Sequence, residues 1–235
     1  MEIAQKRWDS IAKPLHSLGK LETLLIQIAG ITGNAEVDLS RRGLIAMCAD
    51  NGVVEEGVTQ TGQEVTAIVA ENFLKYDTSV GVMCKQNHAE IFPVDMGMVT
   101  DTKVRTDHKI AYGTQNMTKG PAMTREQAVK GLEAGIDMVR ELNDKGYRIL
   151  ATGEMGIGNT TTSSAIASVL LKVPVEKVTG KGAGLSSDGL RHKVHVIEQA
   201  IEKHTPNCND PIDVLSKVGG LDIAGMTGLF LGGAI

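Results

Sequence analysis

Short apolar runs alternate with segments of helical period along most of the chain. Three such runs predict strands, at Leu44–Ala49, Ala89–Val94 and Tyr147–Thr152. Strands that are buried on both faces of a parallel sheet are continuously apolar, unlike strands with one solvated face. Each run is followed by a polar or glycine-rich turn and then by a helical pattern. This order predicts an α/β fold built on a parallel sheet.

The helical segments have apolar residues three and four positions apart, bounded by capping residues or glycine. The predicted helices are Leu15–Ala29, Glu64–Tyr76, Ser79–Asn87, Thr124–Lys145, Asn159–Lys172, Leu190–Lys203, Asp213–Val218 and Asp222–Gly233. Ser17 is a candidate N-cap of the first. The polar stretch 97–121 is the one irregular insertion and is expected to cover a sheet edge or a site. Pro93 favours an edge position for the end of the second strand.

The predicted organisation is an N-terminal helical segment at 1–34 followed by a nucleotide-binding domain at 35–235. The last helical pattern, Asp222–Ile235, stops without a capping signal or a polar tail, and its apolar face requires more sheet beneath it. We therefore expect the C-terminal part of the fold to be missing from the chain.

Composition narrows the functional classes. The 235 residues carry a net charge of −4 with a sequence pI near 5.9, which argues against a broad nucleic-acid-binding face. No run reaches the roughly 18 apolar residues of a membrane span, and the N-terminus lacks a signal-peptide pattern. Cys48, Cys84 and Cys208 show no paired motif, so reduced thiols in a cytoplasmic protein are favoured over a nucleophilic cysteine.

Candidate chemistry lies where the predicted strands end. Asp50–Gly52, Asp95–Gly97 and Gly153–Thr162 leave the carboxyl ends of the three strands. In open α/β sheets, ligands bind in the crevice outside those ends. The acidic residues also have a structural interpretation, because Asp and Asn side chains form turns by bonding to nearby backbone.

The segment Gly153–Thr162 (GEMGIGNTTT) carries the strongest signal. Glycines allow backbone N–H groups to converge on an anion, and Asn159, Thr160 and Thr161 open a helix at its positive end. The segment matches neither a Walker A loop nor G-x-G-x-x-G, which disfavours a nicotinamide-dependent oxidoreductase. Glu154 would repel a phosphate, so we expect the phosphate near Gly156–Thr161. The alternative is a glycine-rich turn selected for packing.

A second glycine cluster follows at Thr179–Gly184 (TGKGAG). Gly180 and Gly182 would offer backbone amides, and Lys193 on the next helix would complete a phosphate clamp. His192 and His195 could be interpreted as metal ligands, but a solvated helix face is favoured. No metal and no cofactor are predicted.

Four blocks together resemble the nicotinate-nucleotide–dimethylbenzimidazole phosphoribosyltransferase family. The blocks, in the family's order and spanning nearly the whole chain, are Ser17–Glu22, Cys48–Val53, Gly153–Thr161 and Asp213–Gly228. The resemblance implies a Rossmann-like parallel sheet, a small helical domain built from the chain's ends, and a homodimer. It implies transfer of phosphoribose from nicotinate mononucleotide to 5,6-dimethylbenzimidazole or a related base, giving α-ribazole 5′-phosphate for the lower ligand of cobalamin.

The resemblance also implies roles for individual residues. Gly156, Gly182 and Lys193 would hold the phosphate, with Asn159, Thr160, Thr161 and Gly180 beside them. The base pocket would be bordered by Thr61, Val69, Glu154 and Met155.

Three departures from the family pattern matter. The family's general-base glutamate lies beyond Ile235, so no catalytic residue is assigned. Thr61 and Val69 replace a common serine and glutamine, which leaves the accepted base open to a purine or a hydroxylated benzimidazole. His16 and Asn51 stand where many members have glycine and histidine. A protein that binds nucleotide or base without turning it over is therefore the alternative hypothesis.

Overall fold

The computed structural model describes residues 1–234, in two compact units. The first unit is Met1–Arg41, and the second begins at Arg42 and runs to the end of the chain. The division falls a few residues after the expected boundary at Asn34.

The first unit contains two helices, α1 (Glu2–Ser10) and α2 (Lys20–Thr32). Ala4, Ile26 and Ala29 form its small core. The prediction of a helix from Leu15 was wrong at its start, because His16 and Gly19 both have positive φ values, of 57° and 56°. These left-handed conformations cannot continue a right-handed helix. Helix α1 had no prediction from the sequence.

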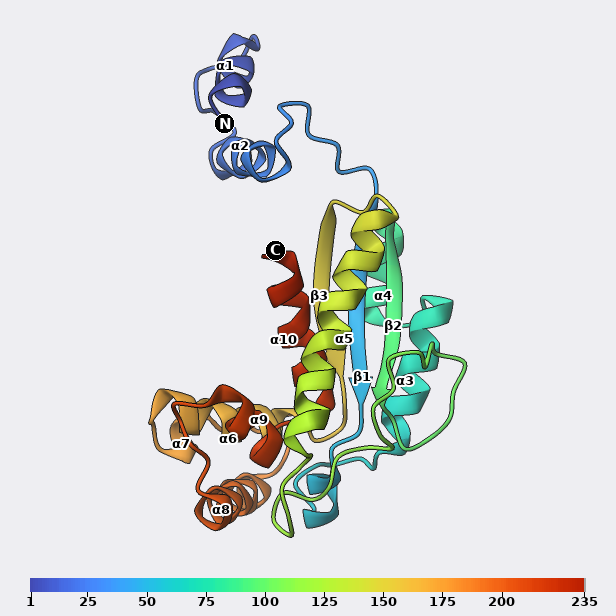
Figure 1. Ribbon diagram of the computed structural model, residues 1–235, viewed down its shortest axis with the longest axis vertical. Helices are drawn as coiled ribbons and strands as arrows, with labels where there is room; N and C mark the ends of the chain where they lie inside the picture. Colours follow the sequence, from blue (N-terminus) through green and yellow to red (C-terminus); the bar gives the residue numbers. More distant parts are fainter. Residues whose placement is uncertain (235) are drawn as a thin grey trace. The chain divides into compact units, whose positions relative to one another are not determined.

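The second unit is an α/β sandwich around a parallel sheet (Figure 1). Its elements are β1 (Arg42–Ala49), the 3-10 turn η1 (Gly52–Glu56), α3 (Glu64–Lys75), α4 (Ser79–Gln86), β2 (Ala89–Gly97), α5 (Arg125–Asp144), β3 (Ile149–Met155), α6 (Asn159–Leu171), α7 (Val175–Val178), α8 (Ser187–His204), α9 (Pro211–Val218) and α10 (Leu221–Gly233). The predicted α/β class and parallel sheet are confirmed.

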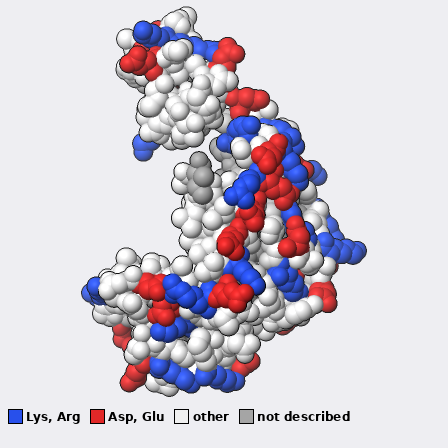
Figure 2. All heavy atoms as spheres, viewed as in Figure 1, with Lys and Arg blue, Asp and Glu red and all other residues white. Residues whose placement is uncertain are grey.

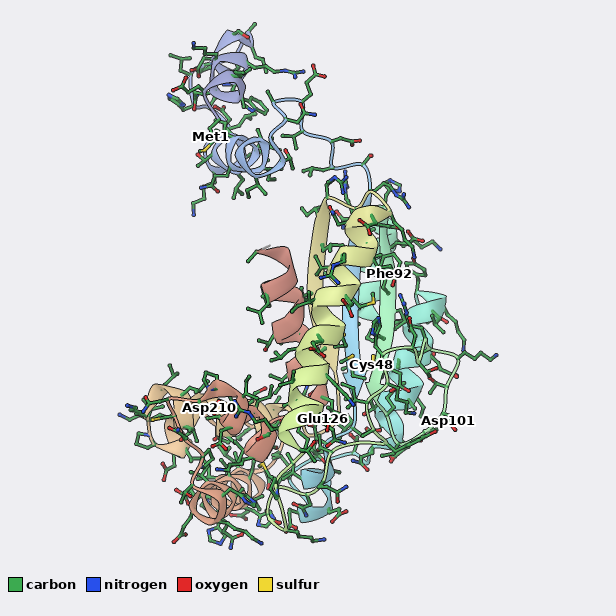
Figure 3. The ribbon with its side chains drawn as sticks, in the orientation of Figure 1. Met1, Cys48, Phe92, Asp101, Glu126 and Asp210 are labelled. Carbon is green, nitrogen blue, oxygen red and sulfur yellow. The ribbon has the colours of Figure 1, made fainter. Side chains whose placement is uncertain are left out.

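Strand β1 lies in the middle of the three-stranded sheet, in the order β2-β1-β3. Its residues alternate between the two faces, as successive strand residues must. Ile45 and Met47 pack on the face covered by α5 and α10, whereas Ala46 and Cys48 pack on the face covered by α3 and α4. Cys48 is therefore enclosed within the fold (Figure 3). Burial on both faces explains why β1 is continuously apolar.

Strand β2 is an edge strand, which accommodates Pro93. The polar segment after β2 returns along this edge, as the sequence suggested. The backbone N–H of Asp95 donates to the Arg105 carbonyl at 3.0 Å, and that of Ile110 donates to the Met96 carbonyl at 3.0 Å. This segment therefore shields the outer edge of the sheet.

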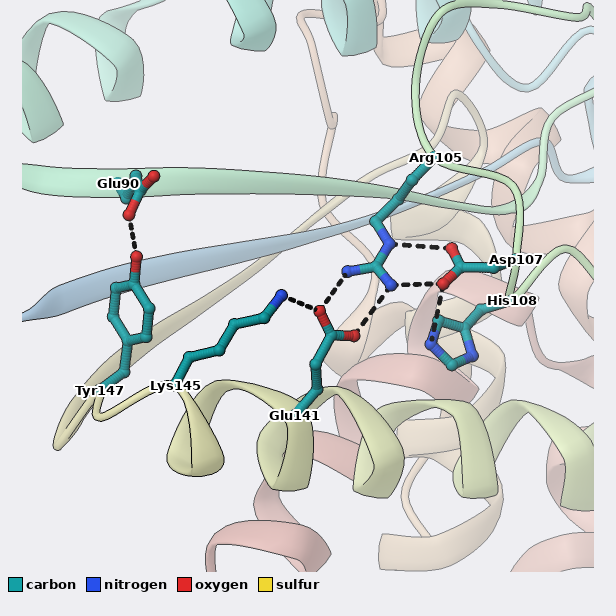
Figure 4. A network of polar contacts seen from close by, with 7 residues as sticks. All are labelled: Glu90, Arg105, Asp107, His108, Glu141, Lys145 and Tyr147. Atoms are coloured by element: carbon teal, nitrogen blue, oxygen red, sulfur yellow. Dashed lines mark hydrogen bonds and ion pairs between the residues drawn. The ribbon is translucent and has the colours of Figure 1, made fainter.

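A cluster of charged side chains ties the same segment to α5 (Figure 4). The Arg105 guanidinium bridges Asp107 and Glu141, and Lys145 donates to Glu141 at 2.6 Å. These two cations hold the pKa of Glu141 down, to about 2, with Arg105 the larger cause. Elsewhere on the face drawn in Figure 2, acidic and basic side chains are interspersed.

The third strand begins and ends later than the sequence predicted. It runs from Ile149 to Met155, so Glu154 is a strand residue, in register with Met47 of β1. Tyr147 instead lies in the turn after α5, where its ring packs edge-on against Phe92 with centroids 5.3 Å apart. The turn between β3 and α6 is consequently limited to Gly156–Gly158.

Helices α5 and α10 pack unusually closely through small residues. A Cβ added at Gly228 would collide with the Leu132 carbonyl oxygen, and one at Gly135 would collide with that of Gly225. Close backbone approach of this kind requires glycine. None of the helices in residues 1–234 combines the length and apolar character needed to cross a membrane.

We predict that Gly228→Ala lowers the free energy of unfolding by about 1–3 kcal/mol, the usual effect of overpacking a dense core. The added methyl would force α10 away from α5. Gly233→Ala is the matched control on the same helix, because a Cβ there meets nothing within 4 Å. Thermal denaturation of both variants measures the difference. Equal melting temperatures would show that the helix pair tolerates a wider separation.

Candidate functional site

The candidate site lies at the carboxyl ends of the strands, where the sheet changes direction. The chain goes from β1 outward to β2 and then returns past β1 to form β3. In open α/β sheets, the crevice between strands at such a switch point is where ligands bind. Asn51 follows β1, and Gly156 follows β3. The start of α10 also reaches this position, through Asp222.

Lys193 is the most unusual charged residue of the site. Its side chain is buried, with the whole residue 1% exposed, and comes from the second turn of α8. Its Nζ donates to Thr160 Oγ1 at 2.7 Å and to the Gly180 carbonyl at 3.4 Å. Burial lowers its pKa. Within residues 1–234, no carboxylate lies within 4.0 Å of this ammonium group, so its charge is not compensated.

The two glycine-rich segments meet at this lysine. A Cβ on Gly182 would lie 3.1 Å from Thr160 Oγ1 and 3.6 Å from Lys193 Nζ. The structure thus brings together Thr160, Gly180, Gly182 and Lys193, as the sequence predicted for a phosphate clamp. Gly158, with a φ of 93°, is the N-cap of α6 and has no side chain, and Asn159 Oδ1 accepts from the Thr160 backbone N–H at 2.6 Å. The positive end of the helix dipole lies here, which favours an anion nearby.

Glu154 lies on the other side of the same turn. Its carboxylate accepts a hydrogen bond from Asn159 Nδ2 at 2.5 Å. Burial raises its pKa, and the bond from Asn159 opposes that rise. Among the described residues, no lysine, arginine or histidine forms an ion pair with it. Glu154 and Lys193 are thus both ionisable groups of the site without an ion-pair partner among the described residues.

Gly156 lies where three segments converge. A Cβ there would collide with the Ala49 carbonyl oxygen and with Asp222 Oδ2. Asn51 Nδ2 donates to Asp222 Oδ2 at 3.2 Å and to the Ile157 carbonyl at 3.4 Å. The backbone N–H of Ile157 donates to Thr66 Oγ1 at 3.0 Å. The turn is thus held from both β1 and α3.

The predicted base-pocket residues are only partly brought together. Val69 of α3 and Met155 of β3 pack against the same apolar cluster. Thr61 is exposed, in a loop whose neighbour Gln60 donates to the Gly184 carbonyl at 2.6 Å. Thr161 is fully buried, so its side chain faces the interior.

The acids at the ends of β1 and β2 and the two histidines of α8 have partners within the fold. Asp50 Oδ2 accepts from the Val99 backbone N–H at 2.8 Å, and Asp95 Oδ1 accepts from that of Met98 at 2.7 Å. These acids hold the segment after β2, as the turn-forming interpretation predicted. His192 Nε2 lies 2.6 Å from the Glu56 carbonyl oxygen and His195 Nε2 lies 3.0 Å from Gln199 Nε2, so both imidazoles have partners other than a metal.

Sequence reasoning did not find Asp222, Gln63 or Thr66. Asp222 was assigned to a helix and to the block Asp213–Gly228 of the family resemblance but was given no role in the site, and its DIAG context gives no sign of a buried carboxylate. Gln63 Nε2 donates to the Asn51 carbonyl at 3.1 Å. The signal that could have indicated Asp222 is the glycine pair Gly219-Gly220 just before it, because paired glycines mark a close approach of groups. In the structure, a Cβ on Gly220 would collide with Asp222 Oδ1.

Comparison with known proteins identifies the family. A family model described as "Phosphoribosyltransferase" matches residues 1–235. The nicotinate-nucleotide–dimethylbenzimidazole phosphoribosyltransferase of Ruminiclostridium cellulolyticum is 51% identical over 236 residues, and that of Clostridium acetobutylicum is 50% identical over 237. The chain belongs to this family. The resemblance stated from the sequence is confirmed.

Solved structures agree with the assignment. The crystal structure of CobT from Thermus thermophilus superposes with a TM-score of 0.87 at 35% identity, covering 98% of this chain and 70% of that one. All of this chain aligns with the relatives from R. cellulolyticum and C. acetobutylicum, and it spans 67% of the length of each. For the relative from Clostridium perfringens strain 13 the corresponding share of length is 64%.

The buried carboxylate of Asp222 predicts a pH dependence of stability. Burial, with a further contribution from Glu154, raises its pKa to about 7 from a usual value near 3.8. Between about pH 4 and pH 7 the folded chain keeps a proton that the unfolded chain has released, so Asp222 lowers the free energy of unfolding as the pH rises. In Asp222→Asn this contribution is absent. We expect the melting temperature of the variant, relative to the unaltered chain, to rise between about pH 4 and pH 7.

Thr161→Val is the control, since it replaces a buried polar group that does not titrate. Its melting temperature relative to the unaltered chain should stay constant over the same range. A constant difference for Asp222→Asn as well would contradict the raised pKa.

Proposed function

We propose that this chain binds nicotinate mononucleotide and a benzimidazole-type base, and that it takes part in transfer of phosphoribose from the first to the second. The observation that supports this most directly is a pair of charged groups, Lys193 buried and Glu154 half-buried, that lack ion-pair partners. Within residues 1–234, Lys193 is an ammonium group without a carboxylate, and Glu154 is a carboxyl group without a cation. Nicotinate mononucleotide carries an anionic phosphate and a cationic pyridinium, and so would complement both.

The positions of the two groups orient the ligand. The phosphate would bind where Lys193, Thr160 and the Gly180–Gly182 backbone meet, beside the N-terminus of α6. Asn159 donates to Glu154 and precedes Thr160, so it separates the anionic end from the ring end. The nicotinate ring and the incoming base would lie toward Glu154, Met155 and Val69.

The proposed chemistry requires mainly positioning. The azole nitrogen of the base forms a bond to the anomeric carbon while the bond from that carbon to the pyridinium nitrogen breaks, with inversion at carbon. Nicotinate leaves with the bonding electrons, which neutralise its ring nitrogen. Holding both reactants in line supplies much of the rate enhancement. The azole N–H proton must pass to a base, and no residue is assigned to that role among residues 1–234.

Several finer points remain predictions from the sequence. These are the Rossmann-like nature of the complete sheet, the homodimer, the cytoplasmic location and the identity of the accepted base. Val69 and Met155 present an apolar surface, which favours a hydrophobic ring such as dimethylbenzimidazole over a purine with more polar edges. The alternative function is binding of nucleotide or base without turnover.

Calorimetry with nicotinate mononucleotide, followed by mass spectrometry after adding dimethylbenzimidazole, tests the proposal. We expect saturable nucleotide binding and a product with the mass of α-ribazole 5′-phosphate. Binding without product would favour the non-catalytic alternative. If neither nicotinate mononucleotide nor dimethylbenzimidazole bound, the proposed function would be wrong.

We predict that Lys193→Met abolishes most nucleotide binding while leaving the unligated fold as stable as before. Methionine removes a buried charge that the unligated protein does not compensate, and it preserves the apolar stem. The lost hydrogen bond to a charged group should weaken binding by about 1.5–3 kcal/mol. Melting temperatures with and without nicotinate mononucleotide report both effects.

Lys130→Ala is the control for loss of a positive charge, because Lys130 is exposed on α5 and pairs with Glu126. It should bind nucleotide normally. A Lys193→Met protein that unfolds at much lower temperature yet binds normally would show that the lysine serves the fold instead.

A further inference from the structure

A buried amide–carboxylate pair lies directly beneath the ligand-binding turn. Asn51 comes from the end of β1 and Asp222 from the first turn of α10, and both residues are 0% exposed. They are 171 positions apart in sequence, and Asn51 Nδ2 lies 3.2 Å from Asp222 Oδ2. The second carboxylate oxygen, Oδ1, accepts from the Ile223 backbone N–H at 2.9 Å. Both oxygens of Asp222 therefore have donors.

Asn51 also holds the backbone of the turn. The same Nδ2 group donates to the Ile157 carbonyl at 3.4 Å, so one amide joins Asp222 to the segment between β3 and α6. Gly156 packs against both residues without room for a side chain. The Asn51 amide thus helps to position the Ile157 carbonyl, while Thr66 Oγ1 holds the Ile157 N–H. Gly158 and Thr160 come next in the chain.

Packing alone gives no reason to keep a carboxylate here. A carboxyl group removed from water is unfavourable unless it has a partner, and the charged groups near Asp222 are no help. Glu154 on β3 repels it, and Cys48 on β1 adds no positive charge. Its donors are an amide and a backbone N–H. Above its pKa of about 7 the Asp222 carboxylate can only accept, so in the ionised form it forces Asn51 to present its NH₂ group.

We propose that Asp222 is a positioning residue, which fixes the Asn51 amide so that Asn51 in turn anchors the Ile157 carbonyl and keeps the Gly156–Thr161 segment ready to bind nucleotide. Asp222 is too deeply buried to contact the ligand. This inference rests on the proposed function for its effect on nucleotide binding, but its effect on the order of the turn is independent of any ligand.

A reciprocal exchange of the two side chains tests the inference. The variants are Asn51→Asp, Asp222→Asn and the double variant that carries both changes. In the double variant the new amide at 222 can donate to the new carboxylate at 51, which restores the contact and leaves the net charge unchanged. The carboxylate at 51 cannot donate to the Ile157 carbonyl, so the anchor of the turn stays broken.

The measurements are the melting temperature, hydrogen–deuterium exchange of peptides that cover Gly156–Thr162, and the dissociation constant of nicotinate mononucleotide. We expect both single variants to melt lower and the double variant to recover much of that loss. Exchange of the turn should remain faster in the double variant, and the dissociation constant should stay roughly tenfold higher, the order expected for one lost hydrogen bond.

The control for general destabilisation is Leu142→Ala, a core substitution at the end of α5. It should lower the melting temperature without selectively speeding exchange of the turn. The double variant decides the question even if a single variant does not fold.

Three results would overturn the inference. One is a double variant no more stable than the single variants, because the contact would then not be the stabilising feature. Another is a double variant whose turn exchanges at the unaltered rate, which would make the pair purely structural. The third is normal exchange in Asp222→Asn. If instead the unaltered chain does not bind nicotinate mononucleotide, the proposed function fails, and the exchange data still decide the role of Asp222.

Discussion

The close contact between α5 and α10 is the constraint on which the site depends. Gly135 of α5 and Gly228 of α10 let the two backbones approach without intervening side chains. Because α5 covers β1 and β2 through the main core cluster, α10 is held against the same face of the sheet. The first turn of α10 is thereby brought to the carboxyl ends of β1 and β3. If a single methyl group between the two helices pushed α10 away from α5, Asp222 would move relative to Asn51.

The topology of the sheet also determines how the site is arranged. The order β2-β1-β3 sends the two crossover connections to opposite faces, so α3 and α5 diverge at the end of β1 and open a space there. Glu154 enters this space from β3 and Lys193 enters it from α8. Neither position is set by local sequence alone. Each depends on a strand or helix that packs against residues distant in the chain.

Much of the site could be predicted from the sequence, because clustered glycines followed by a lysine on the next helix are typical of an anion-binding site. The Gly153–Thr162 and Thr179–Gly184 segments, with Lys193, were identified by the chemistry that anions require, and they do meet in space. The end of β3 was missed because its glycines resemble a loop, whereas pairing with β1 extends the strand and overrides that local preference. Asp222 was missed because its partner Asn51 is 171 residues away, and a contact of such long range leaves no local signal. Sequence reasoning therefore found the residues that would face the ligand more readily than the residues that hold them in place.

The contrast between two lysines shows why the uncompensated charges point to a ligand. In the first unit, Lys13 is mostly buried, and its Nζ lies 2.9 Å from Glu22 Oε1. Lys13 lowers the pKa of Glu22, as expected for a pair that satisfies its own charge. Lys193 is more deeply buried and has only a hydroxyl and a carbonyl as partners. Burying an ammonium group without a carboxylate lowers stability. A bound anion would remove this penalty, so the buried lysine supports the phosphate site proposed beside Thr160 and Gly180.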